Sequence, residues 1–547
     1  TRLNEKALSS KLMGQNIAEM SEHTLGELMK LTLEIPTALP EEMTDMAESI
    51  VKEFQRTGQR LVDLGLSYLT LDRAGATLSN GELQRVQIAR AVRSETTGVL
   101  YVLDEPSIGL HPYNVDGLMH IIRELVERKN SVVMVDHDTR ILRLADQLIE
   151  IGPGAGEKGG RIITQGTPLQ AESNPASLIG PFLADKAQII VRERADEKHM
   201  FDLGRIRIKT KPFYTMHALD ASFPKGRLTV VTGVSGAGKT SLVLECLVPA
   251  LQAVVHKEQL PEHVVSADAE GVTSADIIDS KPIGANVRST VATYDGVFDD
   301  LRKLFAKTED AKKEKLSASD FSYNTGSLRC PTCDGTGSIS LDVQFLPDIS
   351  ITCPTCGGSR YAKHAYDIKW KGKDSKGDGI SLPDILSLTA EDASTVLKGE
   401  KKIEQQLDIL NTLGIGYLTL GEATPALSGG EAQRLKLSSE MNTPQSGSVF
   451  VFDEPTIGLH PLDVRKLIQV FDQLIAHGAT IIVIEHDLDL IANADYVIDM
   501  GPGGGSEGGE IVAEGTPECI ANNPKSLTGR YLKEVLAADP KEENSSI

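Results

Sequence analysis

The sequence predicts an α/β protein with two tandem nucleotide-binding modules, the second of which contains an inserted zinc hairpin. Three observations predict this fold. A phosphate-loop motif, GVSGAGKT at 233–240, follows the apolar run 228–231, a set of motifs recurs at a spacing of 349 residues, and two Cys-x-x-Cys pairs lie near 330 and 353. A buried strand, a glycine-rich loop and a helix in that order form the local structure in which such a loop binds phosphate.

The phosphate loop is the strongest single motif in the chain. Its glycines allow backbone amides to close around phosphate oxygens, and the helix expected from Ser241 adds partial positive charge. Lys239 is expected to reach the β- and γ-phosphates, and the Thr240 hydroxyl to ligate Mg²⁺. A glycine-rich turn without function is the alternative, which the flanking strand and helix disfavour. The predicted nucleotide-binding residues of this loop are Gly233, Val234, Ser235, Gly236, Ala237, Gly238, Lys239, Thr240 and Ser241.

Length, charge and cysteine content limit the number of domains, the kind of nucleic-acid site and the cellular compartment that the protein can have. A chain of 547 residues is too long for one core, so two or more domains are expected. The net charge of −21 means that nucleic acid could be bound only by a local basic patch. No apolar run approaches the ~20 residues that cross a bilayer, and the paired cysteines favour metal in a reducing compartment over disulfides. We therefore expect a cytoplasmic protein without membrane contact.

An internal repeat organises the chain. LGLSYLTL at 64–71 returns as LGIGYLTL at 413–420, LSNGE at 78–82 as LSGGE at 427–431, and DEPSIGLHP at 104–112 as DEPTIGLHP at 453–461. Two copies of one nucleotide-binding unit explain this pattern. Only copy two contains a phosphate loop and a cysteine module, so copy one is expected to be truncated at its N-terminus and the chain to be a fragment.

Each copy contains an apolar strand that ends in two acids. In SVFVFDEP at 448–455, Asp453 is expected to hold Mg²⁺ and Glu454 to act as general base on the attacking water. A second apolar run ends in His486, which is placed to contact the γ-phosphate. Together with Lys239, these three are the predicted catalytic residues. Copy one repeats the pattern in Asp104, Glu105 and His137.

LSNGELQR and LSGGEAQR each place a serine three residues before a glutamate, which is a capping box at the start of a helix. A well-capped surface helix is the alternative interpretation. With the paired acids and the histidines, however, these segments resemble the signatures of the ABC ATPase superfamily. That resemblance implies that the loop at 233 is closed by Ser79, Gly81 and Glu82 of copy one. The reciprocal site would use the signature at 428–431 but would lack a phosphate loop, so at most one site is complete.

Four cysteines have the spacing of a zinc site. Cys330 and Cys333 are separated by nineteen residues from Cys353 and Cys356, as in four-cysteine zinc modules. A redox dithiol is the alternative, which the second pair disfavours. The remaining cysteines, Cys246 and Cys519, are expected to be buried thiols.

A zinc module between phosphate loop and signature is a narrow combination, and with it the chain resembles the UvrA family, the damage-sensing ATPases of bacterial nucleotide excision repair. The segments that carry the resemblance include GVSGAGKT, VRSTVATYDGVFDDLRKLFA at 287–306, FLPD at 345–348 and GPGGGSEGGEIVAEGTP at 501–517. The resemblance implies two ABC modules with helical signature lobes and ATP, Mg²⁺ and Zn²⁺ as cofactors. It further implies a homodimer that binds damaged double-stranded DNA, and UvrB as partner of the full-length protein.

The resemblance also implies a DNA-facing region in copy two. Five residues fall there: Arg288, Tyr294, Arg302, Lys303 and Arg329. Because the same stretch contains Asp299, Asp300 and Asp310, a mixed and solvated surface is the alternative.

Two departures from the family pattern leave other functions open. Ser280 stands where the family has a glutamine after aspartate, and Asn80 replaces the first signature glycine of copy one. Such changes also fit a UvrA-like paralogue that gives tolerance to DNA-binding drugs. A third possibility, the ATPase subunit of a membrane transporter, is disfavoured by the cysteine module.

The expected domain organisation follows the repeat. Copy one provides a partial signature lobe at 1–95 and a partial nucleotide lobe at 96–195. Copy two provides the first part of its nucleotide lobe at 200–250, a signature lobe at 251–444 with the zinc module at 326–362, and the rest of the nucleotide lobe at 445–547.

Overall fold

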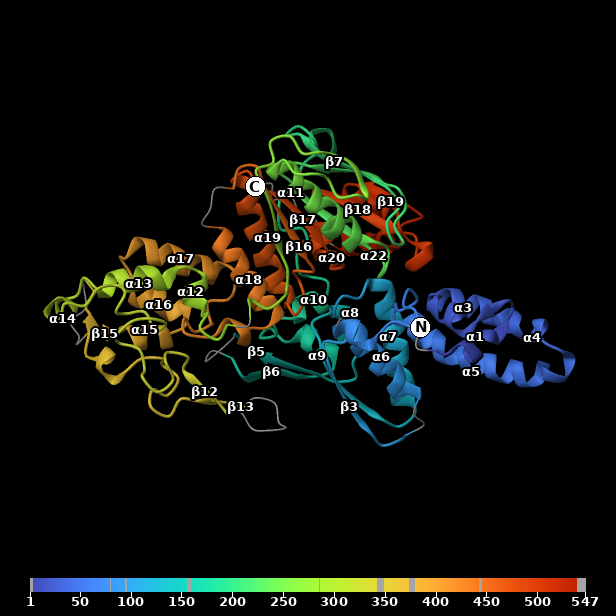
Figure 1. Ribbon diagram of the computed structural model, residues 1–547, viewed down its shortest axis with the longest axis horizontal. Helices are drawn as coiled ribbons and strands as arrows, with labels where there is room; N and C mark the ends of the chain where they lie inside the picture. Colours follow the sequence, from blue (N-terminus) through green and yellow to red (C-terminus); the bar gives the residue numbers. More distant parts are fainter. Residues whose placement is uncertain are drawn as a thin grey trace. The chain divides into compact units, whose positions relative to one another are not determined.

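The computed structural model describes residues 3–78, 80–93, 96–154, 159–284, 286–341, 349–372, 379–441 and 445–538. The chain divides into two compact units. Unit 1 comprises residues 1–150, 162–277 and 446–547, and unit 2 comprises residues 151–161 and 278–445. Figure 1 colours the ribbon along the sequence, so the blue, green and red segments that unit 1 combines can be followed there. None of the described helices has the length and apolar character that crossing a membrane requires.

Unit 1 contains a six-stranded sheet with the order β11-β16-β17-β9-β18-β19. Strands β16, β17, β9 and β18 run parallel, and β19 pairs antiparallel with β18. Every residue of β9 and β17 is buried, as their apolar sequences require. The bounds are β9 Leu228–Gly233, β11 Ser274–Ile278, β16 Ser448–Asp453, β17 Thr480–Ile484, β18 Tyr496–Gly501 and β19 Glu510–Gly515. The strands predicted before the phosphate loop and before the paired acids are therefore confirmed.

Helices of copy two follow these strands, as in other parallel sheets. The phosphate loop leads from β9 into a π-helical turn at Ser241–Leu247 and then into α11 at Val248–His256. The other helices are α19 Pro461–Ala476, α20 Leu488–Ala492, α21 Pro517–Ala521 and α22 Leu527–Ala538. An antiparallel sheet of order β10-β7-β8 completes this part, with β7 Arg205–Thr210, β8 Asp220–Pro224 and β10 Val264–Asp268.

Copy one contributes a smaller set of the same elements to unit 1. Parallel strand β3 is followed by the 16-residue helix α7 and parallel strand β4 by the short helix α8, and α7 packs on one face of the strand pair through a common apolar core. The bounds are α3 Leu25–Leu31, α5 Thr44–Asp63, α6 Asn80–Arg93, β3 Leu100–Asp104, α7 Pro112–Glu127, β4 Ser131–Val135, α8 Thr139–Arg143, β5 Leu148–Gly152, β6 Arg161–Gly166, α9 Pro168–Ser173 and α10 Gly180–Leu183.

The second face of the β3–β4 pair differs from its counterpart in copy two. Four apolar side chains on this face, Leu100, Val102, Val133 and Val135, are between 51% and 67% exposed. Their repeat partners Val449, Val451, Ile482 and Ile484 are at most 1% exposed, because they pack in one cluster with Leu242, Val243, Cys246 and Leu247 of the segment after the phosphate loop. The exposed face of copy one is thus the face that the phosphate-loop segment covers in copy two.

Unit 2 is mainly helical and contains the cysteine hairpin. Strands β12 and β13 pair antiparallel, and the cysteine pairs lie at the base of this hairpin. The bounds are α12 Val291–Tyr294, α13 Val297–Phe305, α14 Glu309–Lys313, β12 Ser338–Leu341, β13 Ile349–Thr352, α15 Leu382–Ser387, α16 Ala390–Val396, α17 Lys401–Thr412 and α18 Gly429–Glu440. Ser428 caps α18 with both bonds of the predicted capping box.

Candidate nucleotide site and four-cysteine cluster

The phosphate loop has a backbone that requires glycine. Gly233, Gly236 and Gly238 have φ angles of 129°, 78° and 97°, which side chains other than glycine rarely adopt. A Cβ at Gly233 would lie 2.0 Å from the carbonyl oxygen of Met500. Of the other loop residues, Val234 and Ala237 are buried, whereas Ser235, Thr240 and Ser241 keep access to solvent. The loop can therefore present hydroxyl groups and backbone amides to a ligand.

Lys239 lies in a buried position at the centre of this loop. Its Nζ donates hydrogen bonds to the carbonyl oxygens of Gly233, at 2.9 Å, and Val234, at 3.0 Å. Burial lowers the pKa of Lys239 to about 8, although the carboxylates of Glu454 and Asp499 oppose the shift. The Lys239 ammonium group is thus held beside the loop, and both of these hydrogen bonds go to backbone carbonyl oxygens rather than to a carboxylate.

The two predicted acids lie at the end of β16. Glu454 follows Asp453 with a φ of 45°, in the left-handed region, and its amide donates to the carbonyl of Ile484 at 2.9 Å. Burial raises the pKa of Glu454, and the charge of Asp453 raises it further. Lys239 and Arg85 lower that pKa by their positive charges. Glu105 of copy one has the same unusual backbone, with a φ of 43°.

The start of the copy-one signature helix belongs to the same unit as the phosphate loop. Ser79 lies outside the described residues, and α6 begins at Asn80. Glu82 is buried and accepts a hydrogen bond of 2.5 Å from the Tyr68 hydroxyl, while the Tyr68 ring lies against Gly236. Gly81 lies near the carbonyl of Ile108, 3.5 Å from where a Cβ would stand. The phosphate loop and the signature region of copy one therefore meet through Tyr68.

Arg85, one turn further along α6, is an additional charge at this site. Its side chain is buried, and its Nε and Nη1 have no hydrogen-bond partner. Burial lowers the pKa of Arg85, and the charges of Glu82 and Glu454 oppose that shift. A buried guanidinium with free donors is costly unless an anion pairs with it.

The turn that follows the paired acids in each copy lies against the second acid of the other copy. A Cβ at Gly109 of copy one would lie 2.9 Å from Oε2 of Glu454, and one at Gly458 of copy two would lie 3.3 Å from Oε1 of Glu105. His486 is buried, its Nδ1 has no hydrogen-bond partner, and burial lowers its pKa well below the ordinary value. By contrast, His137 lies 3.6 Å from the Glu105 carboxylate, which raises its pKa. The two copies thus make reciprocal contacts but not equivalent ones.

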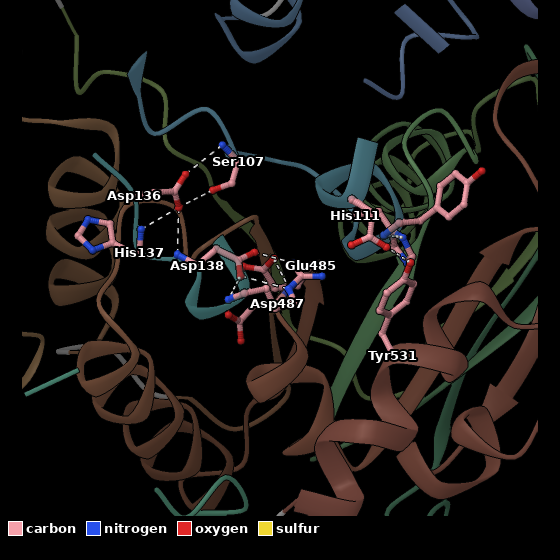
Figure 2. A network of polar contacts seen from close by, with 11 residues as sticks. Ser107, His111, Asp136, His137, Asp138, Glu485, Asp487 and Tyr531 are labelled. Atoms are coloured by element: carbon pink, nitrogen blue, oxygen red, sulfur yellow. Dashed lines mark hydrogen bonds and ion pairs between the residues drawn. The ribbon is translucent and has the colours of Figure 1, made fainter. Parts of the chain in front are cut away.

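A cavity of about 460 Å³ lies among these turns and is lined by both copies. Figure 2 shows the copy-one side, where the carboxylate of Asp136 accepts hydrogen bonds from the Ser107 hydroxyl at 2.8 Å and the His137 amide at 2.7 Å. In copy two, Glu485 occupies the position of Asp136 and accepts from Thr456 and from the His486 amide. Each histidine is therefore fixed at its backbone by an acid directly before it.

The four predicted metal-binding cysteines lie together in unit 2. The sulfur atoms of Cys330, Cys333, Cys353 and Cys356 all lie within 4.8 Å of one another. The Cys330–Cys353 and Cys333–Cys356 sulfur pairs are 4.0 Å and 3.7 Å apart, and all four residues are free thiols. A hydrogen bond from the Cys356 backbone amide lowers the pKa of Cys353 to about 7. This donor set has the composition of a structural zinc site.

The cations predicted to face DNA are paired with acids in unit 2. Arg288 and Arg329 both contact Asp334, at 3.2 Å and 3.0 Å. Arg302 pairs with Asp299, and Lys303 lies 3.2 Å from Asp300. Tyr294 is partly buried, and its pKa is raised by burial. These contacts describe a surface of mixed charge.

Several residues of the site carry no motif of their own. Tyr68, Arg85, Gly109 and His111 each contact or face a copy-two residue from a distant part of the chain. The internal repeat could have indicated them, because Tyr68 and His111 have counterparts at Tyr417 and His460. One prediction was wrong: Cys519 is exposed on α21, because that helix turns Ile520 inward instead. Cys246 is buried as predicted.

Several known proteins are similar to this chain over nearly its whole length. UvrABC system protein A of Staphylococcus aureus (strain COL) is 42% identical over 546 residues, which are 98% of this chain and 56% of that protein. UvrABC system protein A of Staphylococcus epidermidis is 41% identical over the same shares. The crystal structure of UvrA2 from Deinococcus radiodurans has a TM-score of 0.86 and 38% identity, covering 98% of this chain and 65% of that one. No protein-family model matches. The chain spans about half the length of the curated relatives it matches.

Proposed function

The chain is a UvrA-like protein, and on that premise we propose that it is the ATP-hydrolysing, DNA-binding part of a subunit that recognises damaged DNA in nucleotide excision repair and loads UvrB. One observation carries the ATPase proposal. The phosphate loop of copy two, the acid Glu454 and the signature region of copy one lie in one compact unit, joined by the Tyr68 contact with Gly236. These are the parts that must meet around a triphosphate in a two-copy ATPase.

The loop residues 233–241 would hold ATP, with Lys239 on the β- and γ-phosphates. Gly81 and Glu82, with Ser79, would close the site from copy one. For Mg²⁺, the exposed Thr240 hydroxyl and the Asp453 carboxylate are oxygen ligands of the kind the ion prefers, and the metal would offset phosphate charge.

In hydrolysis, Glu454 would act as general base and His486 would contact the γ-phosphate. Burial raises the pKa of the Glu454 carboxyl group, which makes its carboxylate a stronger base toward the attacking water. The positive charges of Lys239 and Arg85 oppose this rise in the pKa and favour the carboxylate form. His486 is neutral because burial lowers its pKa, and its unpaired Nδ1 is available to a γ-phosphate oxygen. The free donors of Arg85 would meet the negative charge that the ligand brings.

The four cysteines would bind one zinc ion. In a tetrahedron with bonds of about 2.3 Å, neighbouring sulfurs are about 3.8 Å apart. The observed 3.7 Å and 4.0 Å fit that geometry. The ion would stabilise the base of the β12–β13 hairpin and would take no part in ATP chemistry.

The DNA-binding proposal rests on the family resemblance and concerns unit 2. Arg288, Tyr294, Arg302, Lys303 and Arg329 would contact the duplex, and Asp334 would have to release the two arginines it pairs with. Binding by such cations weakens steeply as salt rises, so salt-insensitive binding would contradict this surface. We further propose a cytoplasmic homodimer without membrane contact, with UvrB as the partner of the full-length protein.

The test of the ATPase proposal uses the single phosphate-loop motif of the sequence. Lys239→Ala should reduce affinity for a fluorescent ATP analogue by roughly a hundredfold, because the charge-assisted contacts to phosphate are lost. The exposed Lys525→Ala is the matched control and should bind as the unaltered protein does. Equal binding by both variants would contradict the proposed site.

A further inference from the structure

We infer that His111 of copy one is a positioning residue for His486, held by a hydrogen-bond relay through Thr528 to Asp499 that exists on one side of the two-copy arrangement. The inference rests on the proposed ATPase function, since it assigns a role within that site. It concerns unit 1 alone, where all four residues lie.

The contacts of His111 determine which of its nitrogens carries the proton. The backbone amide of Tyr113 donates to Nδ1 at 3.2 Å, so Nδ1 is an acceptor. The side chain is fully buried, and burial lowers the pKa of His111 to about 3, so the ring is neutral at pH 7. Its single N–H is therefore on Nε2 and donates to Oγ1 of Thr528 at 3.0 Å.

The relay continues to a rigid part of the sheet. With its oxygen accepting from His111, the Thr528 hydroxyl donates to Oδ1 of Asp499 at 2.8 Å. Asp499 is buried in β18 next to Met500, whose register partner in β9 is Gly233, the first glycine of the phosphate loop. Each hydrogen bond in the relay thus has a defined donor and acceptor, and together these bonds fix the plane of the His111 imidazole.

The fixed ring supports His486 directly. The imidazole rings of His111 and His486 meet edge to face with centroids 5.7 Å apart, and Tyr531 packs edge to face on the His111 ring at 6.2 Å. Figure 2 shows His111 beside Tyr531, apart from the Ser107 and Asp136 group. Since Nδ1 of His486 has no hydrogen-bond partner that would fix the ring, the contact with His111 can set its orientation. His111 comes from the same turn as Gly109, which lies against Glu454.

The reciprocal side, where His460 of copy two meets Phe182 of copy one, lacks this relay. His460 is the repeat partner of His111, and its Nδ1 accepts from Leu462 in the same way. The partner of Thr528 is Ile179, however, which has no hydroxyl, and the ring of His460 packs on Phe182 instead. The partner of Asp499 is Glu150, whose carboxylate is bonded by Ser177 and by the Leu178 and Ile179 amides. The relay therefore marks the side that has the phosphate loop.

The test replaces the hydroxyl of Thr528 without changing its shape. Thr528→Val should lower ATP turnover at saturating ATP roughly tenfold with little change in nucleotide affinity, because a misdirected group slows chemistry more than binding. Thr528→Ser should restore most of the turnover. His460→Ala, the matched control, should leave it within about twofold. In a His486→Ala background, Thr528→Val should have no further effect, because both changes act through one group. An additive loss, or a serine variant as slow as valine, would overturn the inference.

A second measurement does not depend on turnover. With ¹⁵N-labelled histidine, NMR should show His111 protonated on Nε2, and the ring signals of His486 should shift in Thr528→Val but not in Thr528→Ser. Protonation on Nδ1, or unchanged His486 signals in the valine variant, would overturn the relay. Absence of turnover in the unaltered chain would instead contradict the proposed function and leave this NMR result to decide the relay.

Discussion

The ring of Tyr68 lies against Gly236 of the phosphate loop, such that a Cβ at position 236 would be 2.7 Å from Cδ1 of the ring. The hydroxyl of the same side chain donates to Glu82 at 2.5 Å. One residue of copy one thus joins its own signature helix to the phosphate loop of copy two. A substitution at either contact should therefore alter the affinity for nucleotide.

Gly236→Ala should weaken binding of a fluorescent ATP analogue by about tenfold or more, because the added methyl group displaces the ring or the loop and because φ is 78° there. Adding Tyr68→Ala should recover part of the loss, since the clash disappears while the backbone strain remains. A double variant that binds no better than Gly236→Ala would contradict the close contact.

Glu454→Gln should bind ATP and hydrolyse it at least a hundredfold more slowly, because the amide cannot accept the proton of the attacking water. Glu105→Gln is the control, since it alters the same position in copy one, where the sequence has no phosphate loop. Single-turnover hydrolysis measures both. A larger loss in Glu105→Gln would place the base in the other copy.

ATP binding should take up protons above neutral pH. Burial lowers the pKa of Lys239 to about 8, so at pH 8 about half of the molecules carry a neutral amine. Phosphate charge favours the ammonium form and raises this pKa, hence affinity should fall as pH rises through 8. Calorimetry in two buffers of different ionisation enthalpy measures the uptake. The uptake should grow between pH 7 and pH 9, and a constant value would contradict the assignment.

Zinc content should follow the four-cysteine cluster. Cys353→Ser should remove the single zinc ion per chain and unfold the base of the hairpin, because three thiolates and a hydroxyl bind zinc far more weakly. Cys246→Ser, a buried cysteine outside the cluster, is the control. Metal analysis by mass spectrometry would show one zinc in the control and none in the cluster variant. Equal zinc in both would argue against the cluster.

The same face of the strand pair should respond differently to an added charge in the two copies. Val451→Asp buries a carboxylate and should lower the free energy of unfolding by about 3 kcal/mol or more. Val102→Asp, the same position in copy one, is exposed and should change it by less than about 0.5 kcal/mol. Urea titration compares them. Similar losses in both variants would show that the copy-one face is covered in solution.

Local patterns predicted the elements of the site well, because each motif sits directly on the strand or helix that presents it. The strand before Gly233, the helix after it, and the positions of Asp453 and Glu454 all follow from runs of a few residues. The long-range contacts could not be predicted in this way. Nothing near Tyr68 indicates that it meets Gly236, since the two are joined only by the folded unit.

The two aligned copies differ at positions that no single motif marks. The exchange of Thr528 for Ile179 is visible in the aligned repeats, and it distinguishes the relay side from the other. The sequence identifies Arg288 and Arg329 as cations. It does not indicate that they share Asp334 as a partner, because that contact depends on how the cysteine module folds. The predicted domain boundaries and the roles of the site residues stay predictions.

Both glutamates after the paired-acid strands hold a backbone conformation that suits glycine better than any other residue. At either position, glycine would relieve about 1 kcal/mol of left-handed backbone strain and would remove the carboxylate. Each glutamate thus places a carboxylate at the end of its strand in a backbone conformation that glycine would adopt without strain, and residues under such strain cluster at functional sites.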